Sequence, residues 1–550
     1  MAKRFRKLIA VFTTAITVLA GSALPAMAAP ETMPDGGTFD AEFYAATYPD
    51  VAAAVGTDTN TLYQHYLLAG KAEGRLPYAG AGGGGTVTTP AANVPASDGV
   101  YLTDAKTVTL RWTASVRDWN LAKGNSGQDW VGIYSMAPFE YAIPAGRTPI
   151  AKITFTDADW AQANGGKLTK TVTFQLPDNG LYLKYSVGGA GTQELTHQYI
   201  CNPEILATNT KARVAYPAKA PEGIFANYNI DTRQYSDSYG RGTAKIVQFN
   251  NYGHNPALKN PLANMADAHA PWAYDVDKQP FQYMLNATDM NGVMTMANIM
   301  HEVAAKGPGQ DYIIGNEVNV RKWAYIAYQG SDYAYVQQYV QAFRVAYNAI
   351  KSADANARVF ICMDQNWDRN HPASYWEHYC VIDVKDFLDM FNEQIQLEGN
   401  IDWCMAFHPH PVPLTYAKFW DNSADYTRLV NKNQMVTVQN LSVVSNYLAQ
   451  PQFLNTKGQA RAVIATEVGY SANQGADVQG AAVYAAYAAV VRNPVVETIV
   501  INQDPQPNIN SIFSPKAAEV YANMDGANGA AYDAWAKSVI GISDWGQILR

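Results

Sequence analysis

Beyond about residue 202, short apolar runs alternate with longer segments in which apolar side chains recur every three or four positions. Short apolar runs are typical of buried β-strands, and the three- and four-residue spacing is typical of helices with one buried face. Residues 332–352 show the helical pattern, with apolar side chains at positions 336, 339, 340, 343, 347 and 350. After a weak first strand near residue 223, the predicted strands are 245–252, 281–285, 311–317, 358–364, 401–408, 461–467 and 497–503.

Eight β-then-α units in this part of the chain suit a (β/α)8 TIM barrel with insertions, which we expect over residues 202–545. A doubly wound open sheet is the alternative. Such sheets often place a glycine-rich phosphate loop after a strand, and none of the predicted strands is followed by one. In a TIM barrel the functional side chains lie at the carboxyl ends of the strands.

The chain before the predicted barrel divides into three parts. Residues 99–200 hold short runs rich in Val, Ile, Thr and Tyr between Gly, Asn and Asp, which predicts an antiparallel β-sandwich. Its DWVGIY and LPDNGLYLKY stretches resemble immunoglobulin-like accessory modules of secreted bacterial enzymes, which implies a spacer or binding role. Residues 79–98 read as a Gly- and Pro-rich linker. Residues 39–78 resemble a short helical module of bacterial exported proteins, and cell-envelope attachment is one hypothesis for it.

The N-terminus has the pattern of a secretory signal peptide. Lys3, Arg4, Arg6 and Lys7 precede an apolar stretch from residue 8 to about residue 20, and Ala-Met-Ala at 26–28 suits cleavage. We therefore expect residues 1–28 to be removed from a secreted, extracellular protein. The apolar stretch is too short to span a bilayer, and no later run of 18 or more apolar residues predicts a transmembrane segment.

Composition narrows the class of ligand. Charged residues make up 16% of the chain and aromatic residues 12%, with 35 Tyr and 12 Trp. This composition excludes a disordered polyelectrolyte. The formal net charge is −8, and it falls to −12 when the four basic residues of the signal peptide are removed, so nucleic acid would be repelled at long range. Low charge with many aromatic rings favours a neutral, ring-shaped ligand such as a carbohydrate.

The four cysteines leave two readings open. Cys201, Cys362, Cys380 and Cys404 can pair in an exported protein, or they can be buried free thiols. Four cysteines in 550 residues are too few for a disulfide scaffold, and their spacing does not predict a zinc site.

Polar residues end several of the predicted strands, and two of them are glutamates, Glu317 and Glu467. In a barrel both would lie at the same mouth although they are 150 residues apart in sequence. Glycosidic bond cleavage needs such a pair, one carboxyl group protonated to act as acid and one ionised to attack the anomeric carbon or to activate water. Two nearby carboxyl groups in a partly dry site have pKa values that are pushed apart.

The motifs around these glutamates resemble those of clan A retaining glycoside hydrolases. In that clan an acid/base Glu follows an Asn at the end of strand four, and the nucleophile Glu ends strand seven. Here IIGNEVN (313–319) and VIATEVGYS (463–471) occupy the predicted fourth and seventh strands. Together with FRVAYNAIKS (343–352), MDQNWD (363–368) and FHPHP (407–411), they also resemble an uncharacterised bacterial family of glycoside-hydrolase-like barrels.

This resemblance implies a role for each matching residue. Glu317 would be the acid/base, Asn316 would bind the sugar 2-hydroxyl, and Glu467 would be the nucleophile. The substrate-binding residues implied by the motifs, or expected beside them, are Asn316, Asp364, Asn366, Trp367, His408, His410, Tyr470 and Asp504. The sequence thus predicts a secreted retaining glycosidase that acts on a poly- or oligosaccharide without a cofactor or metal.

Two departures from the clan keep other functions open. Strand 245–252 lacks the Arg that usually lies near the nucleophile, and the eighth strand ends in INQDPQP without the usual Trp, so that Asn250, Asn251, Gln503 or Asp504 would line the mouth. One alternative is therefore a carbohydrate-binding barrel without turnover. Another is a metal-dependent hydrolase, because His408 and His410 form an H-x-H motif, although no further ligand set is evident.

Overall fold

The computed structural model describes residues 31–33, 38–67, 77, 97–126, 130–154, 156–161, 163, 165–236, 243–269, 280–370, 377–421, 425–506 and 509–550. The predicted signal peptide and most of the predicted linker lie outside these residues. The chain forms two compact units, which divide between Gly84 and Gly85. No described helix is both long enough and apolar enough to cross a membrane.

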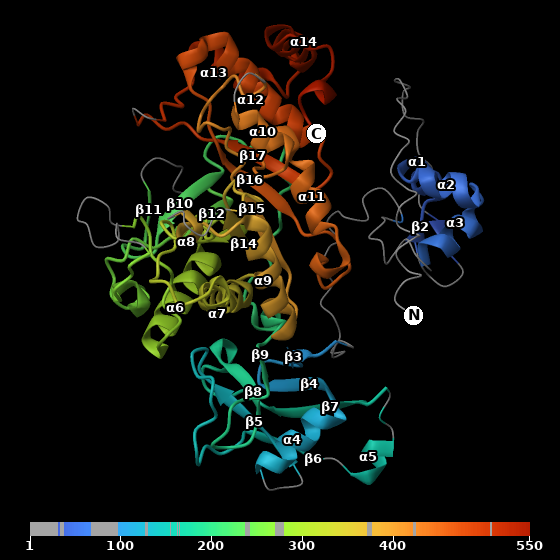
Figure 1. Cartoon of the computed structure of the whole chain (residues 1–550), viewed down its shortest axis with the longest axis vertical. Helices are drawn as coiled ribbons and strands as arrows, with labels where there is room; N and C mark the ends of the chain where they lie inside the picture. The colour runs from blue at the N-terminus through green and yellow to red at the C-terminus, as the bar shows by residue number, and fades with distance from the viewer. Residues whose placement is uncertain are drawn as a thin grey trace. The chain divides into compact units, whose positions relative to one another are not determined.

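The first unit is a small helical module with its own core (Figure 1). A two-stranded antiparallel sheet of β1 (Glu31–Thr32) and β2 (Thr38–Phe39) is followed by α1 (Ala41–Thr47), α2 (Pro49–Val55) and α3 (Thr59–His65). The Asp40 and Asp58 carboxylates accept hydrogen bonds from backbone N–H groups and cap α1 and α3. The core consists of Met33, Phe39, Tyr44, Val51, Leu62 and Tyr63.

The second unit begins with two antiparallel sheets that share one apolar core. One sheet has the order β3 (Gly99–Leu102), β4 (Thr107–Ser115) and β7 (Lys167–Gln175). The other has the order β6 (Ala151–Thr154), β5 (Trp130–Met136), β8 (Lys184–Gly188) and β9 (Thr196–Gln198). Helices α4 (Val116–Ser126) and α5 (Asp157–Ala161) belong to the same region. This arrangement has the two packed sheets expected for residues 99–200, and its immunoglobulin-like character stays a prediction.

The rest of the second unit is built on a curled sheet of eight strands. Seven of them are parallel and neighbour one another in sequence order: β10 (Phe225–Asn229), β12 (Ile246–Asn250), β13 (Asp311–Ile314), β14 (Arg358–Met363), β15 (Trp403–Phe407), β16 (Val463–Val468) and β17 (Val496–Ile501). The two-residue β11 (Gln234–Tyr235) pairs antiparallel with β10. A doubly wound sheet reverses its strand order at a switch point, and this sheet does not. Lys219, upstream of β10, bridges to Ile499 in β17, so the sheet curls toward closure.

The prediction of eight parallel strands is wrong by one. Residues 281–285 are not a strand of this sheet, because β12 pairs directly with β13. Instead, the N–H groups of Phe281, Tyr283 and Met284 donate to the carbonyls of Lys322, Asn251 and Tyr325. The apolar run is therefore satisfied by loop contacts. Glu317 follows the third parallel strand and Glu467 lies in the sixth, rather than the fourth and seventh.

Helices cover the outer face of the sheet, and apolar side chains of mixed size fill its inside. The inner cluster includes Ile246, Ile313, Phe360, Cys362, Cys404, Ala406 and Ile464, at alternate positions of successive strands. The helix α7 spans Asp332–Ala353, within one residue of the predicted helix, and it packs against α6 (Met290–Lys306) and α9 (Val384–Leu397) (Figure 1). The remaining helices are α8 (Glu377–Cys380), α10 (Asp425–Asn431), α11 (Ser442–Leu448), α12 (Ala476–Val491), α13 (Pro515–Asn523) and α14 (Gly529–Ile540).

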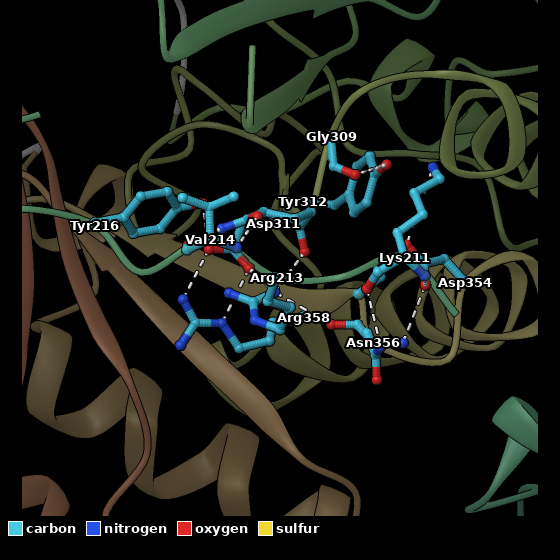
Figure 2. A network of polar contacts seen from close by, with 12 residues as sticks. Lys211, Arg213, Val214, Tyr216, Gly309, Asp311, Tyr312, Asp354, Asn356 and Arg358 are labelled. Atoms are coloured by element: carbon cyan, nitrogen blue, oxygen red, sulfur yellow. Dashed lines mark hydrogen bonds and ion pairs between the residues drawn. The ribbon is translucent and has the colours of Figure 1, made fainter. Parts of the chain in front are cut away.

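A buried ionic network closes the amino-terminal edge of the sheet (Figure 2). Asp311 is fully buried. One of its carboxylate oxygens lies 2.7 Å from Arg213 Nη1, and the other lies 2.7 Å from Arg358 Nη2. The Tyr216 hydroxyl donates to the same carboxylate at 2.7 Å, and Arg358 also binds Glu497. Burial alone would raise the pKa of Asp311, but the arginine charges and hydrogen bonds hold it at about 2. This edge is therefore a structural anchor, and the opposite edge carries the candidate chemistry.

A second charged network joins the two-sheet region to the curled sheet's helices. The His197 ring lies 3.0 Å from Glu194 on its own region and 2.9 Å from Glu398, which follows α9. Glu398 also faces Arg344 on α7 at 3.4 Å, and its carbonyl accepts a hydrogen bond from the Tyr199 N–H group. These contacts explain why the two regions form one compact unit.

Candidate active site

Glu317 lies in a tight turn at the carboxyl end of β13. Gly315 and Glu317 both have positive φ angles, 85° and 37°. A glutamate in the left-handed region is uncommon and is found where the surroundings enforce it, often at functional sites. The Gly315 N–H group donates to the Phe249 carbonyl at 3.0 Å, and the Val318 N–H group donates to the Cys362 carbonyl at 2.8 Å. Backbone hydrogen bonds to both neighbouring strands therefore fix the turn that carries Glu317.

A bulge in β16 directs Glu467 toward the same site. Ala465 pairs with Ile499 and Val468 pairs with Ile501, so β16 has one residue more than β17 between these two pairs. If side chains alternated without interruption along β16 from Ile464, which faces inward, the Glu467 side chain would face outward. With the extra residue, the Glu467 carboxylate instead accepts a hydrogen bond from Asn502 at 3.3 Å on the inner side.

His408 connects the two glutamates. It follows β15, two positions after the inward-facing Ala406, and it is fully buried. Its Nδ1 atom lies 2.9 Å from Glu317 Oε1 and 3.5 Å from Glu467 Oε2, and its Nε2 atom lies 3.3 Å from the Cys362 thiol. His410 Nε2 lies 3.9 Å from Glu317 and 3.8 Å from Glu467. Two carboxyl groups and two imidazoles thus form one cluster.

Burial sets the electrostatics of this cluster. It raises the pKa of Glu317 to about 7. It also raises the pKa of Glu467, but His408 and the hydrogen bond from Asn502 oppose this increase. Burial lowers the pKa of both imidazoles, to about 3 for His410, so both are neutral at neutral pH. The pKa of Glu317 therefore lies near the neutral pH at which a general acid is most effective.

The family of the chain follows from a match over residues 226–548, which is more than half of the sequence and includes this cluster. The chain belongs to DUF5722, a family of unknown function. No curated protein matches the chain.

Solved structures similar to this DUF5722 chain include glycosidases. A family 39 glycoside hydrolase from Bacteroides cellulosilyticus WH2 is 11% identical with a TM-score of 0.34, over 62% of this chain and 69% of that one. A Bacillus subtilis mannanase is 12% identical with a TM-score of 0.28, over 58% and 87%. A xyloglucan-specific endo-β-1,4-glucanase from a metagenomic library is 13% identical with a TM-score of 0.28, over 53% and 71%. At these values the likeness assigns neither substrate nor mechanism.

Asn316, beside Glu317, is held by Gln248, a residue that sequence reasoning missed. The Gln248 side chain in β12 donates to the side-chain oxygen of Asn316, Oδ1, at 2.7 Å, and the Asn250 side chain, which the sequence placed at the mouth, donates to Asn227 Oδ1 at 3.0 Å. Gln248 is a polar residue inside an otherwise apolar strand, and that was the available signal in the sequence. Asn502 and Cys362 gave no comparable signal.

Asp364 and Asn366 lie next to the cluster, but their side chains are hydrogen-bonded to each other. The buried Asp364 carboxylate accepts hydrogen bonds from the Asn319 side chain at 2.8 Å, from the Asn366 N–H group at 2.9 Å and from the Asn366 side chain. Burial and the charge of Glu317 raise the pKa of Asp364 to about 7. These residues hold the loop after β14 in place beside Glu317.

Two predicted binding residues are contradicted by their burial. Trp367 is 3% exposed and packs edge-on against Tyr447, so its ring has no free face for a sugar. Tyr470 is 1% exposed and packs against Phe419. Both side chains belong to the main apolar core of the second unit. Asp504 is half-buried and its charge raises the pKa of Glu467, which places it in the neighbourhood of the cluster.

The described residues include one group that can offer metal ligands, Glu317, His408 and His410, with donor atoms all within 4.8 Å of one another. The cysteines do not contribute to it. All four are buried and none forms a disulfide, which agrees with the second reading of the sequence.

Proposed function

We propose that this chain is a secreted glycoside hydrolase that cleaves O-glycosidic bonds of a poly- or oligosaccharide with retention of configuration. The observation that carries the proposal is the contact of Glu317 and Glu467 with the same nitrogen of His408, at 2.9 and 3.5 Å. Two carboxyl groups so close together, at the carboxyl edge of parallel strands, provide the acid and the nucleophile that this reaction needs. Export rests on the signal-peptide pattern of residues 1–28.

The reaction would proceed in two displacements. A Glu467 oxygen bonds to the anomeric carbon while the bond from that carbon to the leaving oxygen breaks, and Glu317 gives its proton to the leaving oxygen. Water then bonds to the anomeric carbon, the ester to Glu467 breaks, and Glu317 takes the proton from water. His408 would hold both carboxyl groups at the working distance, and Asn316 would contact the sugar.

Proximity favours retention over inversion. One oxygen of Glu317 lies 2.9 Å from His408 Nδ1, and one oxygen of Glu467 lies 3.5 Å from the same atom. The distance between these two oxygens therefore cannot exceed the sum of the two values. Inverting enzymes keep their carboxyl groups roughly 6.5–9.5 Å apart to admit a water molecule, whereas retaining enzymes keep them roughly 5–5.5 Å apart. The short upper bound on the distance between these two oxygens supports the retaining arrangement.

The test is a panel of neutral polysaccharides, with reducing-sugar release as the first readout and the anomeric configuration of the first product by proton NMR as the second. We expect hydrolysis of at least one glycan with a product that retains the configuration of the substrate. A product of inverted configuration would contradict the nucleophile role of Glu467, and release that stops on adding a chelator would favour metal-dependent hydrolysis.

A pH profile of kcat/KM tests the assignment of Glu317 as the acid. Because the acid must be protonated and its pKa is raised to about 7, we expect activity to fall as pH rises through about 7. The residual activity of Glu317→Gln should lack this limb, since glutamine does not titrate. An unchanged alkaline limb in Glu317→Gln would assign the acid to another group.

A carbohydrate-binding barrel without turnover is the second candidate. It is favoured by the absence, among the described residues, of any arginine or lysine in an ion pair with Glu467, whose polar contacts are His408, His410 and Asn502. Affinity electrophoresis on the same glycans separates the two functions, because a binding protein is retarded by a glycan that it does not cleave.

A further inference from the structure

His410 has an environment that the proposed hydrolysis does not explain. The residue is 8% exposed, and its Nδ1 atom has no hydrogen-bond partner. The other ring nitrogen, Nε2, faces Glu317 and Glu467 at 3.9 and 3.8 Å, beyond hydrogen-bond distance of either. The distance from Nε2 to the two carboxylates leaves a place for another atom between them.

The spacing of the imidazole and carboxylate donors suits ligands around one small cation. Zinc binds imidazole nitrogen and carboxylate oxygen at about 2.0–2.2 Å, which in a tetrahedral site separates the ligand atoms by about 3.3–3.6 Å. The imidazole–carboxylate separations here run from 2.9 Å for His408 with Glu317 to 3.9 Å for His410 with Glu317, and the donor atoms of Glu317, His408 and His410 all lie within 4.8 Å of one another. Small side-chain adjustments would bring the four donors into a common coordination sphere.

His408 also has the outer contact of a metal ligand. A ligating histidine usually passes its remote ring N–H to an acceptor, which fixes the ring. Here the remote Nε2 atom of His408 lies 3.3 Å from the buried Cys362 sulfur, a weak acceptor, while Nδ1 faces the carboxylates. One ring orientation therefore serves both the hydrogen bond to Glu317 and a bond to a cation.

We propose that Glu317, Glu467, His408 and His410 bind one divalent transition-metal ion of the zinc class, and that the bound ion blocks the carboxyl groups needed for hydrolysis. Mixed nitrogen and oxygen donors select such ions over Mg²⁺ and Ca²⁺, which prefer oxygen. Metal binding at these side chains requires no carbohydrate, whereas the block of hydrolysis rests on the proposed function.

The test is isothermal titration calorimetry of Zn²⁺ into the full chain after treatment with a chelator. We expect one ion per chain. Loss of an outer-shell partner typically weakens metal binding about 10–100-fold, so His410→Ala, which loses a ligand, should weaken it by at least about tenfold. Glu467→Gln, at a 35% exposed side chain that tolerates change, should weaken it similarly, and Mg²⁺ should give no heat.

The matched control is His254→Ala, which removes an exposed imidazole from the loop after β12 and should leave Zn²⁺ affinity unchanged. Circular dichroism confirms that each variant is folded. Absence of Zn²⁺ binding, or equal affinity of wild type and both cluster variants, overturns the inference. Hydrolysis without zinc binding, or hydrolysis that saturating Zn²⁺ leaves unchanged, refutes this inference alone, whereas zinc binding by a protein whose metal-free form cleaves no glycan refutes the proposed hydrolase.

Discussion

Replacing Glu467 with glutamine should abolish glycan hydrolysis while preserving glycan binding. Glutamine keeps the size and hydrogen-bonding reach of the side chain but cannot attack the anomeric carbon. A positioned acid or base contributes about 10²–10⁴-fold to the rate, and loss of the nucleophile should lower kcat by at least as much. The measurement is kcat on the best glycan of the panel, together with the glycan dissociation constant by calorimetry.

Two comparisons make this prediction specific. Glu519→Gln makes the same chemical change on an exposed face of α13 and should leave kcat unchanged. In Glu467→Ala, azide can enter the space of the lost carboxylate and restore turnover if the missing group is the nucleophile. Full activity in Glu467→Gln would remove Glu467 from the reaction, and a change in affinity alone would favour the binding barrel.

Replacing Asp311 with asparagine should lower the free energy of unfolding by about 3–5 kcal/mol, the range seen when one partner of a buried ion pair is removed. Asp311 is fully buried between Arg213 and Arg358 (Figure 2). An amide there leaves two arginines with less compensation at the edge where β13 and β14 begin. Urea unfolding followed by tryptophan fluorescence measures the change.

The exposed pair of Glu302 and Lys306 on α6 is the control. Its side chains are 51% and 76% exposed, so Glu302→Gln should leave the free energy of unfolding essentially unchanged. The Asp311 effect should also depend on pH. Because the folded pKa of about 2 lies below the unfolded value of about 3.9, the stabilisation is present above pH 4 and is lost as pH falls toward 2. A loss below 1 kcal/mol at neutral pH would show that the network contributes little.

The sequence by itself determined the secondary structure of the long elements and the residues at most strand ends. A helix of 22 residues with a regular apolar face, α7, depends on local spacing alone. Glu317 and His408 follow apolar runs that are long enough to be recognised as strands. Local patterns failed at residues 281–285, because a five-residue apolar run can be satisfied by loop backbone as well as by a sheet.

The sequence could not predict which of these side chains are buried or which residues contact one another in the folded chain. Trp367 and Tyr470 lie in motifs beside polar strand ends, and only the packing of Tyr447 and Phe419 against them shows that their rings are unavailable. Gln248 in β12, Cys362 in β14 and Asn502 just after β17 reach the site from different parts of the sheet. Each contact joins residues that are far apart in the chain, and no spacing rule reports such pairs.

Glu467 shows most clearly which features the sequence determined and which depended on the tertiary structure. The sequence determined that a glutamate ends an apolar strand, and therefore that a carboxyl group is available near the carboxyl edge. Its direction depends on the register between β16 and β17, where one extra residue reverses the alternation of side chains. Register is set by backbone pairing with a neighbouring strand. The tertiary structure alone therefore decided that Glu467 faces His408 and Glu317.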